Sequence, residues 1–260
     1  MLNFKEIQKH FNSEENRTPR LVLMEYLQYK VLEIIFASPY GNRLVFLGGT
    51  CIRIVYGGSR FSEDLDLDNK DFTENEFADL TGIVKQELEK EGIKTEFRNV
   101  YRGAYHCYLK FPRILFENKL SALQDEKILV KIDSGRSRDF QKAVSVAIAK
   151  ADIFSEIRTY PQDLLLAQKI NTLFNRKRAK GRDIFDVLYL FPMTEPDYEY
   201  LKKKLRLYSR EELLKQMRQL FSDKELAALA RDVEPFLVDP SQSERIKKFN
   251  LWLDTQLRKM

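Results

Sequence analysis

Two aspartates, Asp64 and Asp66, are separated by a single leucine in the segment Asp-Leu-Asp-Leu-Asp. Leu65 and Leu67 alternate with them, which is the period of two expected for a strand with one apolar face. The two carboxylates therefore point the same way and repel each other unless a cation lies between them. Magnesium binds a couple of carboxylates together with phosphate oxygens and water, so the pair predicts a magnesium site, with manganese as an alternative ion. A solvated acidic strand is the other interpretation of so short a pattern.

A glycine-containing turn precedes these carboxylates. Residues 44–47 form a short apolar run typical of a buried strand, and Gly48, Gly49 and Thr50 follow it, with Thr50 as a candidate cap of the next helix. Glycines let a backbone approach a triphosphate closely, and the amides at a helix start favour anions. These three residues are therefore candidate nucleotide contacts. A P-loop is excluded, because no Gly-Lys-Ser/Thr follows the glycines.

Other polar residues could serve the same site. Ser62 offers a hydroxyl to phosphate oxygens, and Arg60 offers positive charge, although it could equally pair with a surface carboxylate. Lys131 and Asp133 lie two apart in an alternating segment and so share a strand face. Asp133 could activate an attacking hydroxyl as a base or remain a surface residue, and Lys131 could bind nucleotide or merely neutralise Asp133.

A second polar group lies further along the chain. Lys169 falls within an apolar helical segment, where a charge is costly without a phosphate or carboxylate partner. Asp183 and Asp186 are three apart on the next predicted helix, so they share a face and could hold Lys169, Arg182 or a nucleotide base. The segment between the two predicted helices is rich in cations, which is either an ordinary solvated loop or a footprint for RNA phosphates. The candidate RNA-binding residues are Arg176, Lys177, Arg178 and Lys180.

Composition limits the class of protein. The chain has 260 residues, 43% of them hydrophobic, and a net charge of +5, so a polyanionic partner is allowed but not required. Two isolated cysteines encode neither a disulfide framework nor a zinc site, and neither histidine, His10 nor His106, has a second ligand at metal-binding spacing. No apolar run approaches the roughly 20 residues that span a bilayer. We therefore expect a cytoplasmic protein without a membrane partner.

The elements expected around these residues change along the chain. The sequence predicts a mixed α/β part over residues 1–145. Its expected elements are a helix after Pro19, a helix capped by Thr73 and Glu76, and strands at 44–47, 64–68, 93–100, 105–111 and 127–132. Helical periodicity and three further Ser-x-x-Glu capping boxes, which begin at Ser209, Ser222 and Ser241, predict a mainly helical part over residues 146–260.

Four segments, in this order, resemble the AbiEii/AbiGii-type toxins, a branch of the DNA polymerase β-like nucleotidyltransferases that also includes the MenT-like enzymes. The segments are residues 46–67, 130–133, 166–170 and 180–188. The resemblance spans roughly residues 20–195 and implies an α+β fold, with a mixed sheet, flanking helices and a helical carboxyl-terminal domain that closes the active-site cleft. It also implies that Asp64 and Asp66 are metal ligands, that Ser62 lies with the nucleotide phosphates, and that Lys169 with Asp183 completes the active site.

The same resemblance implies the toxin of a toxin-antitoxin or abortive-infection pair, with a winged-helix antitoxin encoded nearby. The implied reaction is magnesium-dependent transfer of a nucleoside monophosphate from a nucleoside triphosphate to an acceptor hydroxyl, which we expect to be the 3′ end of tRNA. Two alternatives remain. The acceptor could be a small molecule of the aminoglycoside kind or a protein side chain, or the chain could be a non-catalytic regulator that binds nucleotide or RNA.

Overall fold

The structure of the chain is a computed structural model that describes residues 2–137, 139 and 142–260. The chain divides into two compact units. The first unit comprises Met1–Val55 and Phe61–Tyr160, and the second comprises Tyr56–Arg60 and Pro161–Met260. Each unit is described separately below.

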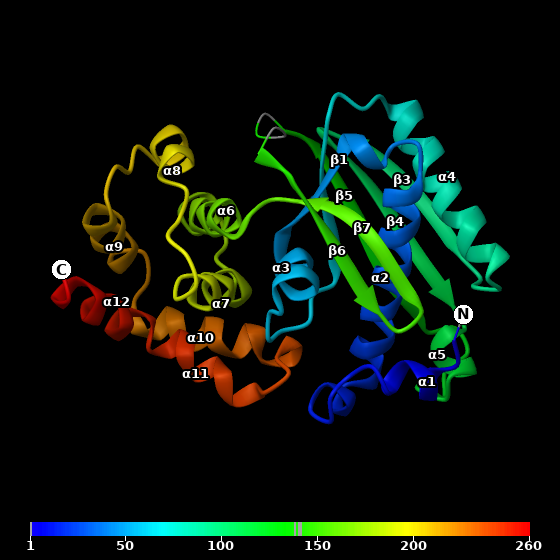
Figure 1. Cartoon of the computed structure of the whole chain (residues 1–260). Helices are drawn as coiled ribbons and strands as arrows, with labels where there is room; N and C mark the ends of the chain where they lie inside the picture. Colours follow the sequence, from blue (N-terminus) through cyan, green and yellow to red (C-terminus); the bar gives the residue numbers. More distant parts are fainter. Residues whose placement is uncertain (1, 138, 140–141) are drawn as a thin grey trace. The chain divides into compact units, whose positions relative to one another are not determined.

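The first unit is built on a seven-stranded mixed sheet with the strand order β3-β4-β5-β2-β1-β7-β6 (Figure 1). Strand β2 runs parallel to β5, β1 runs parallel to β7, and the other neighbours are antiparallel. The strands are β1 (Leu44–Leu47), β2 (Asp64–Asn69), β3 (Glu96–Arg102), β4 (Ala104–Pro112), β5 (Lys127–Arg136), β6 (Val144–Lys150) and β7 (Ile153–Thr159).

Helices cover the apolar face of this sheet. Pro19 opens α2 (Pro19–Ala37), whose side chains are buried almost all round, as expected for a helix packed between a sheet and another helix. Helix α4 (Glu74–Lys90) packs beside α2 and against β3, and the predicted Thr73–Glu76 capping box is confirmed at its start. The shorter helices of this unit are α1 (Phe4–Gln8), α3 (Gly48–Tyr56) and α5 (Ile114–Glu117).

The region after residue 143 differs from the sequence prediction. Strands β6 and β7 form an antiparallel hairpin there, and β7 pairs with β1 through Thr159 and Phe46. The hairpin extends the first unit to Tyr160, so the compact units divide 15 residues beyond the predicted boundary at 145. The hairpin was missed because alanines and exposed apolar residues blur the alternation that marks a strand with one buried face.

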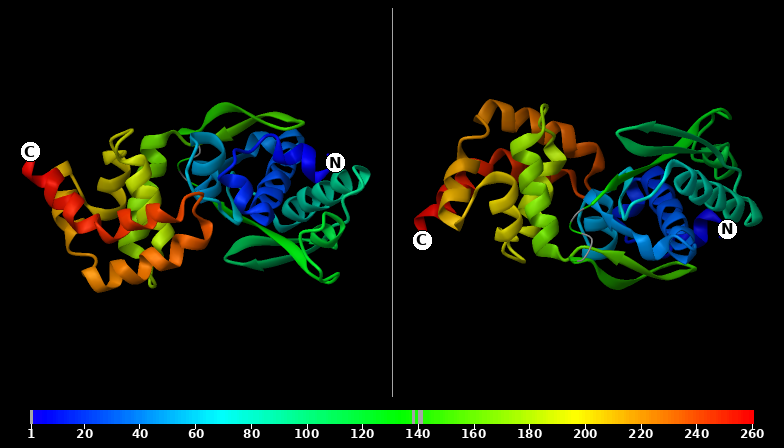
Figure 2. Two further views of the ribbon diagram at one scale, coloured as in Figure 1. Left: turned by 90° about the horizontal axis from the view of Figure 1, so that it is seen from below. Right: turned by 90° about the horizontal axis from the view of Figure 1, so that it is seen from above.

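The second unit is built from helices, and Figure 2 shows them in two further views. They are α6 (Gln162–Asn175), α7 (Gly181–Leu190), α8 (Tyr198–Leu205), α9 (Arg210–Arg218), α10 (Asp223–Val233), α11 (Glu244–Lys247) and α12 (Phe249–Arg258). Ser222 and Glu225 form a complete capping box, and Ser209 caps α9 by accepting from the Glu212 amide. The third predicted box is wrong, because Ser241 lies inside a 3-10 turn that Asp239 caps.

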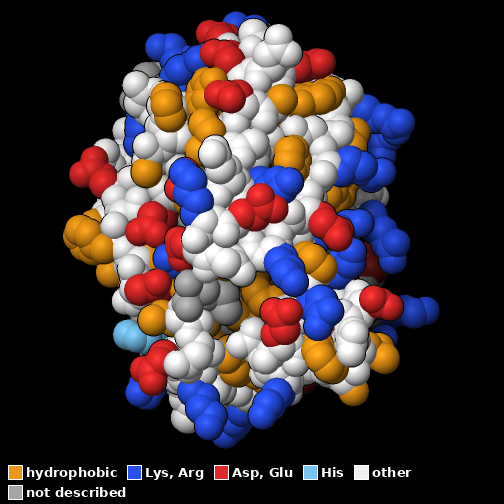
Figure 3. Space-filling model, turned by 90° about the vertical axis from the view of Figure 1, so that its right-hand side faces the viewer, with side chains coloured by type: hydrophobic (Ala, Val, Ile, Leu, Met, Phe, Trp, Pro, Cys, Tyr) orange, Lys and Arg blue, Asp and Glu red, His pale blue; other side chains and the backbone are white. Residues whose placement is uncertain are grey.

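Acidic, basic and scattered apolar side chains are interspersed on the face drawn in Figure 3. Among the described residues, no helix combines the length and the apolar character needed to cross a bilayer.

Candidate active site

The two predicted metal ligands lie on the open face of the first unit's sheet. In β2, Asp64 and Asp66 are half-buried and alternate with buried Leu65 and Leu67, as the sequence predicted. Asp66 is the Cα partner of Leu47 in β1 and of Asp133 in β5. The alternation of the strand therefore places both carboxylates on one face, beside the end of β1.

The turn after β1 approaches one of these carboxylates closely. Gly48 has a φ of +83°, and a Cβ built on it would lie 2.1 Å from Oδ2 of Asp66. Only glycine fits this position, because any side chain would clash with the carboxylate and strain the backbone. Helix α3 begins at Gly48, so its first amides, including that of Gly49, lie beside Asp66 and favour anions there.

Thr50 and Ser62 are both buried, and hydrogen bonds to the backbone hold this part of the chain in place. Thr50 does not cap α3; it lies within the helix, is fully buried, and donates its hydroxyl to the backbone oxygen of Asp64. Ser62 is 7% exposed, and its backbone oxygen accepts from Nε2 of Gln28, 2.8 Å away. Gln28 also donates to the Glu63 oxygen at 3.0 Å, so α2 fixes the chain just before the aspartates.

A buried ion-pair network holds α3 against α2. Arg53 of α3 donates to Glu25 at 2.8 Å and also pairs with Glu15. Burial raises the pKa of Glu25 even though the Arg53 charge opposes the shift. The guanidinium also lies 4.7 Å from the ring centroid of Phe61, just before β2. The network fixes the helix whose amino terminus meets Asp66.

The third carboxylate is held by two neighbours. Lys131 donates to Oδ2 of Asp133 at 2.7 Å, and Nδ1 of His106 in β4 lies 2.7 Å from Oδ1. Burial by itself would lower the pKa of Lys131, but its hydrogen bond to Asp133 and the charges of Asp133 and Asp64 raise it. Sequence analysis gave His106 no role, because only the β4–β5 register brings it to Asp133.

The second unit contains its own buried charge cluster. Arg60 is 3% exposed and binds Asp186 with both Nε and a terminal nitrogen, at 2.6 and 2.7 Å. Lys169 pairs with Asp186 at 2.8 Å and with Asp183 at 3.7 Å, so the carboxylate partner that the sequence required for Lys169 is present. Because Asp186 binds Arg60 so fully, we treat this arginine as structural rather than as a phosphate ligand.

A glycine sets the geometry of this cluster. A Cβ on Gly181 would lie 1.9 Å from the backbone oxygen of Leu229 in α10, so only glycine allows this approach of α7 to α10. The Gly181 amide donates to Asp232 at 3.1 Å. The close packing fixes α7, which carries Asp183 and Asp186 toward Lys169 of α6.

The basic loop is only partly available to a ligand. Arg176 pairs with Asp183 at 3.2 Å. The side chains of Lys177, Arg178 and Lys180 are exposed and make no hydrogen bond or ion pair with any residue that the structure describes. These three cations are therefore the candidates for phosphate contact.

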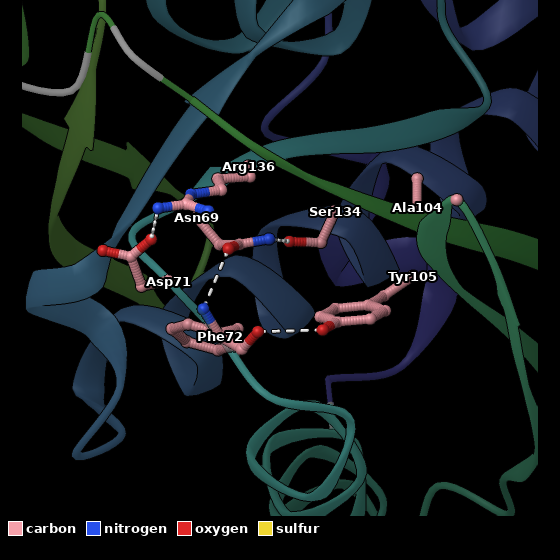
Figure 4. A pocket seen from close by; sticks show the side chains of 8 residues that line it. Asn69, Asp71, Phe72, Ala104, Tyr105, Ser134 and Arg136 are labelled. Carbon is pink, nitrogen blue, oxygen red and sulfur yellow. Dashed lines mark hydrogen bonds and ion pairs between the residues drawn. The ribbon is translucent and has the colours of Figure 1, made fainter.

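A polar pocket of about 400 Å³ opens at the far end of β2, near Asn69 and Arg136 (Figure 4). Its polar groups satisfy one another: Asn69 donates to Ser134 at 3.0 Å, Tyr105 donates to the Phe72 oxygen at 2.8 Å, and Arg136 pairs with Asp71 at 2.6 Å. None of the predicted site residues lines it. We assign it no ligand.

The chemistry of the donors on the sheet face fits magnesium. Within the described ranges, no three His, Cys, Asp or Glu side chains gather into a preformed metal cage. Magnesium does not require one, because it usually binds one or two carboxylates and completes its coordination with phosphate oxygens and water. Asp64 and Asp66 supply the two carboxylates, and the absence of a side chain at Gly48 leaves the Asp66 carboxylate the space that it occupies.

The chain was compared with known proteins. A family model described as nucleotidyl transferase AbiEii toxin, type IV TA system, matches residues 30–254. MenT4, a nucleotidyltransferase toxin from Mycobacterium tuberculosis H37Rv, has a TM-score of 0.59 at 16% identity, covering 98% of this chain and 90% of that one. JHP933 from Helicobacter pylori has a TM-score of 0.53 at 16% identity, covering 92% and 94%. These likenesses confirm the predicted fold. No curated protein gave a significant match.

Proposed function

Because the chain belongs to the AbiEii family of nucleotidyltransferase toxins, we propose that it transfers a nucleoside monophosphate from a nucleoside triphosphate to an acceptor hydroxyl, with a divalent cation held by Asp64 and Asp66. The close approach of Gly48 to Asp66 carries this proposal, since it brings the start of α3 to the carboxylate pair. A triphosphate could thus meet helix amides and metal ligands together.

The candidate site residues of the first unit have distinct proposed tasks in this reaction. Asp64 and Asp66 hold the ion, and the amides that follow Gly48 bind phosphate oxygens. When bound, magnesium supplies neutralising charge and keeps the attacking and leaving oxygens in line. Lys131 anchors Asp133 and adds positive charge beside the nucleotide. The acceptor oxygen bonds to the α-phosphorus as the bond to the bridging oxygen breaks, and pyrophosphate leaves.

The roles of Thr50 and Ser62 follow from their contacts. Thr50 positions Asp64 through the backbone oxygen that it binds. Ser62 is proposed to contribute its hydroxyl to the nucleotide phosphates, held in place by Gln28. In the second unit, Lys169 is proposed to neutralise charge on the departing pyrophosphate, with its ammonium held by Asp183 and Asp186.

We propose the 3′ end of tRNA as the acceptor, because Lys177, Arg178 and Lys180 form a cationic loop without carboxylate partners in the described chain. Incubating the protein with each labelled nucleoside triphosphate and magnesium, with tRNA, an aminoglycoside or protein as acceptor, tests this directly. Label on the tRNA 3′ end supports the proposal. Label only on the aminoglycoside or on protein would identify that molecule as the acceptor instead of tRNA. Label on none of them would favour a non-catalytic protein that binds nucleotide or RNA.

The basic loop gives a quantitative prediction. Changing Lys177, Arg178 and Lys180 to glutamine should weaken tRNA binding and reduce the slope of log affinity against log salt by about 2, because each lost phosphate contact removes about 0.7 from that slope. The same change at Lys202, Lys203 and Lys204 of α8 removes equal charge from the same unit and is the matched control. If the two triple variants show the same slope of log affinity against log salt, the loop is an ordinary solvated surface loop and not an RNA-binding site.

The turn at Gly48 gives a second prediction. In Gly48→Ala, the methyl group must displace the Asp66 carboxylate, so transfer should fall about 100-fold or more, the effect of misplacing a reacting group by about 1 Å. Gly82→Ala in α4 is the control, because a Cβ there meets nothing within 4 Å. A Gly48→Ala variant with the wild-type rate of transfer would show that this turn takes no part in the reaction.

The family also implies an antitoxin, and we propose a small winged-helix protein encoded beside this chain. Co-expression of the neighbouring reading frame should relieve growth inhibition by the chain. Growth inhibition that persists with every neighbouring frame would contradict this partner.

A further inference from the structure

His106 occupies a position that the reaction described above leaves unexplained. Its Nδ1 lies 2.7 Å from Oδ1 of Asp133, while Lys131 binds Oδ2 at the same distance. Because an ionised carboxylate can only accept, Nδ1 carries the hydrogen and the neutral ring presents a lone pair at Nε2. Nε2 has no partner among the residues that the structure describes, and the side chain is 25% exposed.

We propose that His106, oriented by Asp133, is the group that accepts the proton of the acceptor hydroxyl. The inference rests on the proposed transferase function. It assigns Asp133 the task of a carboxylate that fixes the tautomer and orientation of an imidazole, and it makes His106 a catalytic residue. The sequence interpretation had instead considered Asp133 itself as the base.

The sheet register places His106 where an acceptor could reach it. Asp66, Asp133 and His106 are successive Cα partners across β2, β5 and β4. Since neighbouring strands lie about 4.8 Å apart, the imidazole stands roughly 10 Å from the Asp66 backbone on the same open face. A hydroxyl positioned between His106 and the metal ligands would face the α-phosphorus on one side and Nε2 on the other.

Chemistry favours the imidazole over the carboxylate as the base. A general base works best when its pKa lies near the working pH, and histidine ordinarily titrates near neutrality, whereas aspartate titrates about 2.5 units lower. Both oxygens of Asp133 are already engaged, one by a cation and one by the ring. The ring nitrogen Nε2 is the group in this cluster that remains available to a proton.

The charges around His106 come from both neighbouring strands. From β5, Asp133 faces the ring and Lys131 lies behind it. From β3, Val100 is its Cα partner, and Arg98 and Arg102 lie two residues to either side. Tyr108 follows on β4 with the Arg98 guanidinium 5.4 Å from its ring centroid.

The proton balance of the step is complete. The hydroxyl proton moves to Nε2, the freed electron pair forms the new oxygen–phosphorus bond, and the α–β bridging oxygen leaves with pyrophosphate. The resulting imidazolium is stabilised by Asp133 and afterwards releases its proton to solvent. No oxidant, reductant or additional reactant is required.

His106→Asn tests the proposal, because the Asn amide can still donate to Asp133 from near the Nδ1 position but offers no basic nitrogen. We expect kcat to fall about 100-fold or more with little change in the KM for nucleotide, and the acid limb of the kcat–pH profile to disappear. His106→Gln is the second variant in case the first folds poorly. His10→Asn, the same change at an exposed site, is the control.

A readout without substrate accompanies the kinetics. Nitrogen NMR of the imidazole at neutral pH should show the Nδ1-protonated tautomer of His106 in the wild type, and this signature should change in Asp133→Asn. A His106→Asn variant that keeps wild-type kcat and its acid limb would overturn the catalytic role and leave only positioning of Asp133. A wild-type chain that transfers to no acceptor would overturn the transferase proposal itself, so the two failures are distinguishable.

Discussion

Asp66→Asn should reduce nucleotidyl transfer by about 1,000-fold or more while the protein stays folded. The substitution keeps the size of the side chain but removes the charge that we propose to bind magnesium, and loss of the ion would cost several kcal/mol of transition-state stabilisation. Asp64→Asn should behave alike, because both carboxylates share one face of β2. Without metal, either variant should be as stable as the wild type or slightly more so, since a like-charge repulsion has been relieved.

The measurement is initial transfer rate against magnesium concentration, together with growth inhibition on expression. Asp68→Asn is the matched control, because Asp68 lies on the same face of β2 and its carboxylate accepts from Tyr160 at 2.7 Å, a bond that Asn retains. Asp68→Asn should stay active. If both Asp64→Asn and Asp66→Asn kept full activity, the metal assignment would be refuted.

Asp186→Asn should destabilise the protein by about 3–5 kcal/mol at neutral pH, because it leaves Arg60 and Lys169 buried beside a neutral amide. Burial alone would raise the pKa of Asp186, but Arg60 and Lys169 outweigh it and hold the pKa below its ordinary value of 3.8. A lowered folded-state pKa contributes stability above the unfolded value. That contribution is lost as pH falls through the folded-state pKa.

The difference in the free energy of unfolding between wild type and Asp186→Asn should therefore have its full size above about pH 4 and should shrink in stronger acid. Denaturant unfolding at several pH values measures it. Glu211→Gln is the control, since it removes a charge from an exposed pair with Lys215 in the same unit and should change the unfolding midpoint little. An Asp186→Asn variant as stable as the wild type at neutral pH would show that the cluster is not structural.

The match to a family model establishes the class of enzyme to which the chain belongs. The resemblance inferred from four short segments is confirmed by a match over residues 30–254, so the chain is a nucleotidyltransferase of the AbiEii family.

Local patterns in the sequence determined the strand that carries Asp64 and Asp66, the glycine turn before it and most helices. The reason is that alternation, helical periodicity and capping chemistry act over a few residues and can be recognised without knowing the fold. The β6–β7 hairpin escaped because its burial depends on pairing with β1, through Phe46 and Thr159, which no local pattern records.

Only the tertiary structure decided which side chains meet. His106 and Asp133 are 27 residues apart and meet through the β4–β5 register, and Arg60 meets Asp186 across 126 residues. A single sequence gives the type and the local face of a charged residue, but its partner is set by strand pairing and helix packing over long separations. For that reason the sequence singled out Asp64 and Asp66 as a pair on one strand face, while only the structure brought Arg60 to Asp186 and His106 to Asp133.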